Sequence, residues 1–206
     1  MTRLSAILAF LAVVVGLSVG GFYAMRRSNA DPFAPCRTSA VAGGVATIGG
    51  PFALTDGAGR RVTDAETITG PTLVYFGYSF CPDVCPMDLS RNALAAGELA
   101  EKGTKVGQIF ISIDPERDTP EVVREFAAAI DPAVVGLTGT AEEVAAAAAA
   151  YKVYYRKNGD DPDYYLMDHS TFTYLVAPGT GFLDVYRSEA TPEQVADAVQ
   201  CYAERL

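Results

Sequence analysis

Apolar runs and amphipathic segments alternate along most of the chain. Residues 71–79 (PTLVYFGYS) are almost entirely apolar and rich in β-branched and aromatic residues, and residues 105–114 (KVGQIFISID) are largely so. Both runs predict central strands that are buried on both faces. Residues 87–103 between them have a helical composition and end in Lys102 and Gly103, a common helix stop. These three segments predict a strand–helix–strand unit.

Local signals mark the remaining elements. Residues 49–64 predict a hairpin that turns at Asp56-Gly57, and residues 171–178 and 181–188 predict an antiparallel pair of strands. Three further helix starts are expected, at Thr119-Pro120 with proline at the first helical position, and at the capping boxes Thr140–Glu143 and Thr191–Gln194. The alternation of strands and helices predicts an α/β domain with a mixed central sheet flanked by helices.

The N-terminus has a different pattern. From Leu4 to Met25 there are 22 residues without a charge, bounded by Arg3 and by Arg26-Arg27. This length predicts an N-terminal transmembrane helix, and we favour a retained anchor over a cleaved signal peptide. The predicted organisation is a membrane anchor at 1–27, a linker rich in Gly, Ala, Pro and Ser at 28–49, and a globular domain at 50–206.

The charge of the chain excludes some partners. Residues 28–206 carry all 25 acidic residues and 13 of the 16 basic ones, which gives a net charge of −12. Such a surface repels nucleic acid and anionic lipid headgroups, and it suits a basic protein partner or a cation. The arginines at 26 and 27 by themselves favour a cytoplasmic location for everything that follows them.

Two of the four cysteines, Cys36 and Cys201, lie near the two ends of the segment that follows the predicted anchor. Because the termini of a domain often lie close together, they can form a disulfide in an oxidising compartment. Two unpaired cysteines are the equally open alternative.

The other two cysteines stand in the stretch GYSFCPDVCP, residues 77–86. Pro86 biases Cys85 away from helical angles, which predicts a loop that leads from the central strand into the next helix. The helix dipole should then make Cys81 and Cys85 more acidic than a free cysteine. The stretch is compatible with a redox disulfide, with half of a metal site, or with a packed turn.

His169 is the single histidine of the chain, and it immediately precedes the strand predicted at 171–178. In thioredoxin-like folds the loop entering that strand faces the cysteine loop, which would bring His169 beside both thiols. Two thiolates and an imidazole suit copper(I), and the histidine also permits copper(II), whereas zinc prefers a fourth ligand. Asp168 could supply that ligand only with awkward geometry. It could instead orient the imidazole or serve as a loop acid.

Three stretches, in this order, resemble the Sco (SenC) family of copper proteins. They are FGYSFCPDVCP (76–86), SIDPERDTP (112–120) and DHSTFTYLVAPGTGF (168–182). The resemblance covers most of residues 50–206. It implies a thioredoxin-like domain held by one N-terminal helix in the inner membrane. The domain would face the periplasm, or the intermembrane space of mitochondria, which overrides the argument from the two arginines.

The resemblance also implies a ligand set and a target. One copper ion, Cu(I) or Cu(II), would be bound by Cys81, Cys85 and His169 and used to build the dinuclear copper centre of cytochrome c oxidase subunit II. Asp114, Arg117 and Asp118 would belong to a surface loop near the metal, where they support the metal ligands or recognise a partner. From the residues alone, Asp114-Pro115 and Thr119-Pro120 read equally well as turn and cap chemistry.

Our leading hypothesis is therefore a membrane-tethered copper chaperone that also meets a copper donor and a thiol reductant, with no nucleic-acid partner. The alternative is a thiol–disulfide oxidoreductase in which Cys81 and Cys85 are catalytic and form a redox-active disulfide. That enzyme would reduce the copper-ligating cysteines of the oxidase subunit. A copper or redox sensor is a third reading of the same residues.

Overall fold

The computed structural model describes residues 8, 14–18, 31–37, 48–161 and 164–206. The chain forms two compact units, Met1–Pro35 and Cys36–Leu206. Most of the predicted anchor and linker lies outside the described residues, so the division at 27/28 and 49/50 stays a prediction. Within the part of the chain that is described, no helix is both long and apolar enough to cross a membrane.

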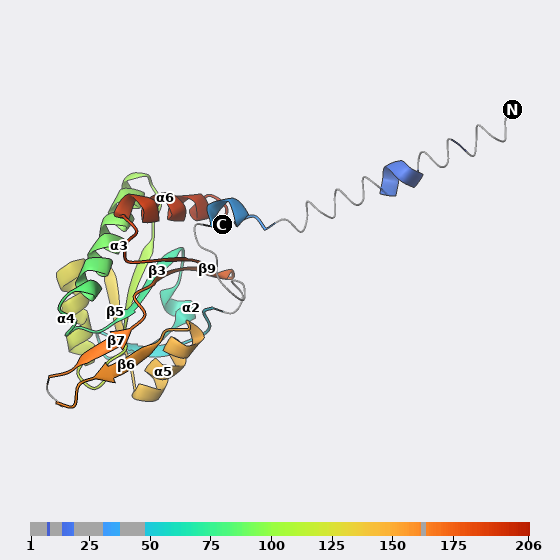
Figure 1. The fold of residues 1–206 in the computed structure, drawn as a ribbon. Coiled ribbons are helices and arrows are strands. Elements are labelled where there is room, and N and C mark those ends of the chain that lie inside the picture. The colour runs from blue at the N-terminus through green and yellow to red at the C-terminus, as the bar shows by residue number, and fades with distance from the viewer. Residues whose placement is uncertain (1–7, 9–13, 19–30, 38–47, 162–163) are drawn as a thin grey trace. The chain divides into compact units, whose positions relative to one another are not determined.

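The elements of the structure alternate as the sequence predicts, with two short helices and an extra pair of strands added (Figure 1). In chain order they are η1 (Ala34–Cys36), β1 (Ala53–Asp56), β2 (Arg61–Thr63), α2 (Asp64–Thr67), β3 (Thr72–Gly77), α3 (Val84–Glu101), β4 (Gly107–Ser112), α4 (Pro120–Ile130), β5 (Val134–Thr138), α5 (Ala141–Ala150), β6 (Tyr155–Asn158), β7 (Leu166–His169), β8 (Thr173–Ala177), β9 (Gly181–Tyr186) and α6 (Pro192–Ala203).

Seven strands form one mixed sheet in the order β2-β1-β5-β4-β3-β8-β9. β3, β4 and β5 run parallel to one another, whereas β8 pairs antiparallel with β3 and β9 antiparallel with β8. Every residue of the central strand β3 is buried, as its apolar sequence predicts. The predicted mixed central sheet is confirmed.

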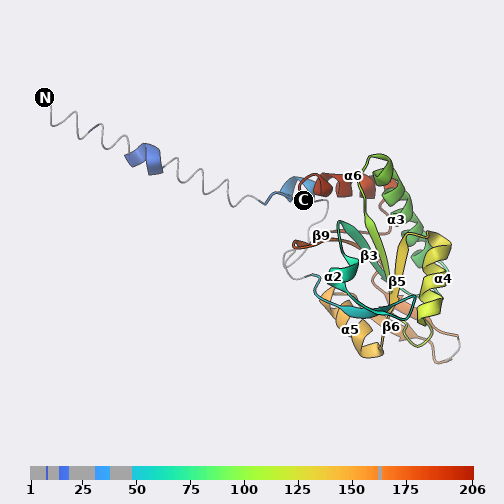
Figure 2. The same cartoon turned by 180° about the vertical axis from the view of Figure 1, so that it is seen from behind.

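Helices cover both faces of this sheet. The crossovers β3–α3–β4 and β4–α4–β5 step in the same direction, so α3 and α4 share one face, where α6 packs beside α3. α5 covers the other face (Figures 1 and 2). There the Phe76 ring of β3 lies 5.2 Å from the ring of Tyr151, which follows α5. Residues of β3 therefore alternate between two buried layers.

The predicted helix starts are confirmed. Thr119 accepts a hydrogen bond from the Val122 amide, with Pro120 at the first helical position of α4. Complete capping boxes open α5 and α6, with Thr140 and Thr191 as their first members. Each cap satisfies amide donors that the helix itself leaves unpaired.

The sequence did not indicate the two-stranded sheet of β6 and β7, which is separate from the main sheet. Residues Arg156–Asn158 are polar and exposed, so the hydrophobic pattern gives no strand signal. His169 closes β7 opposite Tyr155, and β8 begins only at Thr173. The histidine was predicted to sit in a loop directly before that strand. It is instead fixed by a strand pairing of its own.

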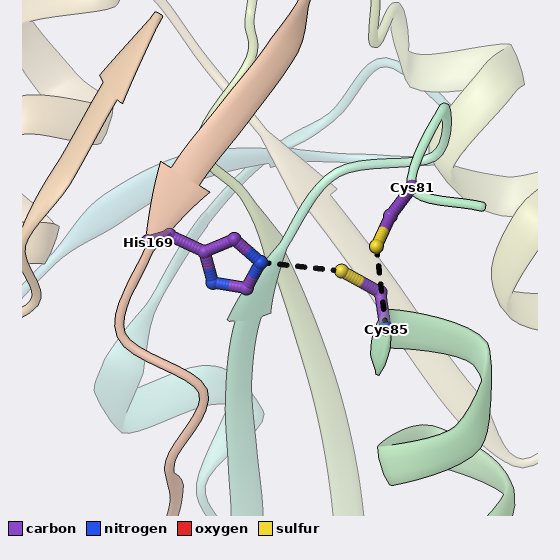
Figure 3. A group of neighbouring side chains, drawn as sticks. All are labelled: Cys81, Cys85 and His169. Atoms are coloured by element: carbon purple, nitrogen blue, oxygen red, sulfur yellow. Dashed lines mark hydrogen bonds between the residues drawn. The ribbon is translucent and has the colours of Figure 1, made fainter. Parts of the chain in front are cut away.

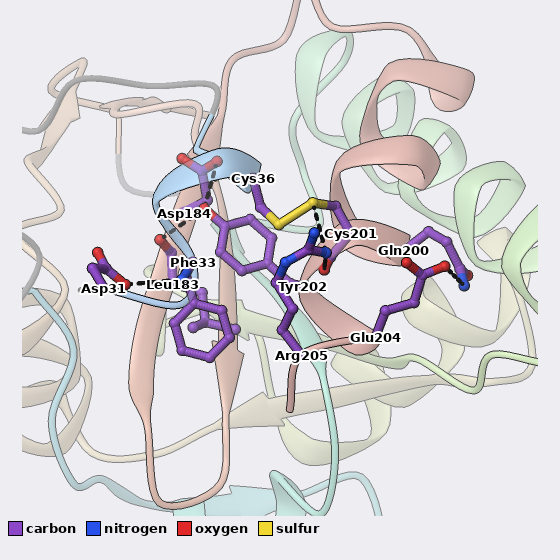
Figure 4. Close-up of a disulfide and its surroundings, with 10 residues drawn as sticks. All are labelled: Asp31, Phe33, Cys36, Leu183, Asp184, Gln200, Cys201, Tyr202, Glu204 and Arg205. Carbon is purple, nitrogen blue, oxygen red and sulfur yellow. Dashed lines mark hydrogen bonds between the residues drawn. A yellow bond between two sulfur atoms is a disulfide. The ribbon is translucent and has the colours of Figure 1, made fainter. Parts of the chain in front are cut away.

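Cys36 and Cys201 form a disulfide, with their Cα atoms 5.6 Å apart (Figure 4). Of the two alternatives that the sequence left open, the structure has the cross-link. It joins the start of the domain to the last turn of α6, over a sequence separation of 165 residues. A link that closes so long a loop removes much of the conformational freedom of the unfolded chain.

The disulfide should contribute to stability without touching the metal-ligand residues. We expect the double variant Cys36→Ser/Cys201→Ser to lower the free energy of unfolding by about 2–5 kcal/mol, measured by urea denaturation. Alkylation of Cys81 in the native protein is the control and should not change. An unfolding free energy equal to that of the wild type would show that the cross-link has no stabilising role.

Candidate metal centre

Gly77 makes room for one of the two thiols. β3 ends at this residue, and a Cβ atom added to it would lie only 2.9 Å from Cys85 Sγ. Cys85 is fully buried in the first turn of α3, which begins at Val84. The predicted loop conformation of Cys85 is therefore wrong. Pro86 is tolerated inside the first turn because an amide there would have no partner within the helix.

Cys81 lies in the loop between β3 and α3 and is 8% exposed. Its Sγ accepts a hydrogen bond from the backbone amide of Cys85, at 3.4 Å. That amide is one of the unpaired donors at the positive end of α3. The helix start therefore points at the sulfur of Cys81, which favours its thiolate.

The two thiols have opposite acidities. The hydrogen bond from the Cys85 side chain is the largest cause that lowers the pKa of Cys81, to about 4, and the backbone amides of Asp83 and Cys85 lower it further. Burial raises the pKa of Cys85 well above its ordinary value, and the neighbouring Cys81 charge adds to the rise. The predicted acidity is thus confirmed for Cys81 and wrong for Cys85. Two such close groups titrate as a pair and share one proton.

His169 approaches the thiols from β7 (Figure 3). Its Nε2 lies 3.4 Å from Cys85 Sγ, and its Nδ1 lies 2.9 Å from the carbonyl oxygen of Ser170. A carbonyl only accepts, so Nδ1 carries the proton in the neutral ring. Nε2 then presents its lone pair to the thiols, which is the arrangement that a metal-binding imidazole needs.

Two tyrosine rings fix the position of this imidazole. The rings of Tyr75 and Tyr78 meet it edge-on, with centroids 6.3 and 5.8 Å away, and both tyrosines are buried. Tyr75 comes from β3, and Tyr78 directly follows that strand. The histidine is therefore packed against the same strand end that carries the cysteine loop.

The ligand atoms of Cys81, Cys85 and His169 all lie within 4.8 Å of one another. A three-coordinate ion with bonds of about 2.0–2.3 Å holds its ligand atoms about 3.5–4 Å apart. Small side-chain adjustments are enough to reach that spacing. Two sulfurs and one imidazole nitrogen form a soft donor set, which fits copper better than magnesium or calcium.

Asp118 supports the cysteine loop through hydrogen bonds. Its carboxylate accepts hydrogen bonds from the Ser79 amide at 3.0 Å and from the hydroxyls of Ser79 and Ser112. The side chain is 1% exposed, and burial raises its pKa. The prediction that Asp118 lies on a partner-binding surface is therefore wrong, because no partner can reach it.

Asp114 is also buried. Together with Arg117 it contacts Tyr165, the residue just before the strand that carries His169. Asp114 accepts hydrogen bonds from Arg117 Nε at 2.6 Å and from the Tyr165 hydroxyl at 2.7 Å. Arg117 donates to the Tyr165 carbonyl at 2.9 Å and lies over the Tyr165 ring. Asp114 is thus not a surface residue, and these contacts hold β7 against the loop after β4.

Asp168 does not orient the imidazole. Neighbouring residues of a strand point to opposite faces, so Asp168 faces away from the ring of His169. Its carboxylate accepts hydrogen bonds from Asn158 and Arg156 across the β6–β7 pair, and these lower its pKa. The backbone carbonyl of Ser170 orients the ring instead. A role of Asp168 in partner binding stays a prediction.

The supporting residues that were not predicted from the sequence are Tyr75, Gly77, Tyr78, Ser79, Ser112, Tyr165 and Ser170. A glycine that ends a run of large apolar residues is the one signal that could have identified Gly77. The others act through contacts between distant segments or through backbone atoms, which no local pattern reports.

A family model described as SCO1/SenC matches residues 41–204. The chain belongs to the SCO1/SenC family. Protein SenC of Rhodobacter capsulatus is 48% identical to it over 206 residues, which cover all of this chain and 92% of that protein. The human mitochondrial SCO1 homolog is 35% identical over 195 residues, which cover 93% of this chain and 64% of that protein.

Two solved SCO1/SenC structures with copper bound share the fold. ScoI of Arabidopsis thaliana superposes with a TM-score of 0.72 and 38% identity, covering 76% of this chain and 99% of that one. Yeast Sco1 gives a TM-score of 0.72 and 34% identity, covering 78% and 90%. These similarities confirm the thioredoxin-like fold. They also show that members of this family bind copper.

The asymmetry of the two thiols predicts an unusual pH dependence of alkylation. A lowered pKa means that Cys81 is a thiolate at every pH above about 4. Its rate with iodoacetamide, measured by peptide mass spectrometry, should therefore be nearly constant from pH 6 to 8.

In Cys85→Ala, the hydrogen bond that lowers this pKa is missing. The pKa of Cys81 should then move up toward the ordinary value near 8.5, and the rate should rise with pH by up to about tenfold per unit. The same rise in the wild type would contradict the assignment of the thiolate to Cys81.

Proposed function

We propose that this chain is a copper chaperone that holds one copper ion between Cys81, Cys85 and His169. The observation that carries the proposal is the convergence of two thiols and an imidazole nitrogen within 4.8 Å at the end of a buried strand. The copper-bound structures of related family members support the choice of metal. Both Cu(I) and Cu(II) fit this set, because thiolates favour the first and imidazole accommodates the second.

Because the three ligands have different surroundings, copper should bind to them, and leave them, in a defined order. Cys81 is charged and slightly exposed, so it can receive copper first, while Nε2 of His169 already faces the thiols. Cys85 must lose its proton as the metal arrives, because burial disfavours its thiolate until a cation is beside it. In the reverse direction, an acceptor thiolate replaces the ligands one at a time.

We infer that the acceptor is the dinuclear copper centre of cytochrome c oxidase subunit II, as the family resemblance implies. The net charge of −9 supports a basic protein partner. The uncharged run from Leu4 to Met25 supports an anchor in the inner membrane, with the domain in the periplasm or the mitochondrial intermembrane space. Confining donor and acceptor to one membrane raises their effective concentration.

A thiol–disulfide oxidoreductase is the second candidate, and one observation favours it. An acidic, slightly exposed Cys81 beside a buried, protonated Cys85 is the asymmetry that an attacking and a resolving thiol need. Such an enzyme would reduce the copper-ligating cysteines of its target. It has no requirement for an imidazole at hydrogen-bond distance from Cys85.

The substitution His169→Ala tests the chaperone and separates it from the oxidoreductase. We expect the affinity for copper to fall by at least about 100-fold, since even the loss of a hydrogen-bond partner of a ligand can cost that much. Reduction of a model disulfide should persist. An unchanged copper affinity, measured by competition with a chelator, would refute the proposed metal site.

Gly77→Ala should also weaken copper binding, although Gly77 is not a ligand. The added methyl group collides with Cys85 Sγ, and overpacking of this kind costs about 1–3 kcal/mol, or at least about fivefold in affinity. Gly97→Ala is the matched control, because a Cβ there meets nothing within 4 Å. Equal copper affinities of the two variants in the same competition assay would contradict the role of Gly77.

A further inference from the structure

Exposed apolar side chains flank the proposed copper ligands along the chain. Phe80 is 41% exposed and Met87 65% exposed, and they flank the two cysteines together with the exposed Pro82. Tyr164, just before β7, is 70% exposed. We call these four residues the apolar rim. Cys81 and Cys85 are buried while these neighbouring side chains face outward, so the rim side chains are not part of the core.

Side-chain contacts fix the two aromatic residues of the rim, Phe80 and Tyr164. The rings of Phe80 and Tyr164 meet edge-on with centroids 5.4 Å apart, which joins the cysteine loop to the segment that carries the histidine. The guanidinium of Arg117 lies 4.7 Å from the Phe80 ring centroid and 3.5 Å from that of Tyr165. Rigid, exposed aromatic residues supported in this way are typical of the centre of a protein interface.

Exposed carboxylates are near the rim residues in the sequence. Asp83 stands between the two cysteines, and Asp160 lies between β6 and β7. The neighbouring cations of the β6–β7 pair are already compensated: Arg156 pairs with Asp168 at 2.9 Å and Lys157 with Glu116 at 3.0 Å. The cations of this strand pair therefore do not offset Asp83 and Asp160, and the whole chain carries a net charge of −9.

We propose that the apolar rim is the docking surface for the protein that receives copper, and that this acceptor carries an apolar contact ringed by Lys and Arg. This inference rests on the proposed chaperone function and adds the surface through which it acts. A second copy of this chain would place carboxylates against carboxylates, which disfavours self-association. A basic acceptor is attracted and brought over the ligands in one orientation.

The variant Tyr164→Ser removes the most exposed ring of the rim without changing a ligand. Its matched control is Val135→Ser, which is also exposed, at 42%. Because β3, β4 and β5 are parallel, Val135 near the start of β5 lies at the opposite end of the sheet from the cysteine loop. The acceptor probe is the soluble copper-binding domain of the subunit II encoded by the same genome.

The experiment uses the full chain loaded with Cu(I) and compares transfer to this acceptor with transfer to bicinchoninate, a small chelator. In Tyr164→Ser, we expect transfer to the acceptor to slow by at least about tenfold, since interface tyrosines are often hot spots. Transfer to the chelator should match the wild type, and Val135→Ser should be unchanged in both. Equal acceptor rates in wild type and Tyr164→Ser would overturn the docking surface and leave the chaperone function standing.

Charge gives a second, independent measurement. The wild-type transfer rate to the acceptor should fall as salt rises, and Asp160→Lys should be slower with a weaker salt dependence. A wild type that binds copper but transfers none to the acceptor would overturn the delivery role and the docking surface with it. A wild-type dimer that Tyr164→Ser dissociates would show that the rim binds a second copy instead.

Discussion

Burial of the Cys85 sulfur is the constraint on which the centre depends. The sulfur fits beneath the end of β3 only because residue 77 has no side chain, and in this position water cannot stabilise a thiolate. The negative charge of the two thiols therefore lies on Cys81, where the start of α3 supplies an amide donor. A second thiolate becomes favourable only when a cation shares the space, so metal binding and loss of the Cys85 proton are one event.

The other supporting contacts converge on the loop between β4 and α4. The two buried aspartates of this loop support different segments. Asp118 binds the cysteine loop through Ser79, and Asp114 binds Tyr165, just before the strand β7 that carries the histidine. Arg117 joins these halves by lying against both Tyr165 and Phe80. β6 and β7 pair with each other and not with the main sheet. These polar contacts therefore hold the strand pair, and His169 with it, against the rest of the domain.

Much of this arrangement could be predicted from local sequence. The apolar, β-branched and aromatic run 71–79 predicts a buried strand. The capping boxes that begin at Thr140 and Thr191 predict two helix starts from a few neighbouring residues. The pairing of β6 with β7 could not be predicted, since polar, exposed residues form strands only when a partner strand is nearby. Pro86 did not reveal the start of α3 at Val84, because the first turn of a helix tolerates proline.

The sequence by itself determined the order along the chain of the long helices and of most main-sheet strands, the mixed sheet and the donor types, because these follow from the periodicity and chemistry of neighbouring residues. Only the tertiary structure decided that Cys81 carries the charge while Cys85 keeps its proton, and that Nε2 of His169 faces the thiols. It also decided that Asp114 and Asp118 are buried supports. The physical reason is that burial and hydrogen-bond partners arise between segments far apart in the chain, so a residue's acidity and accessibility are properties of the fold.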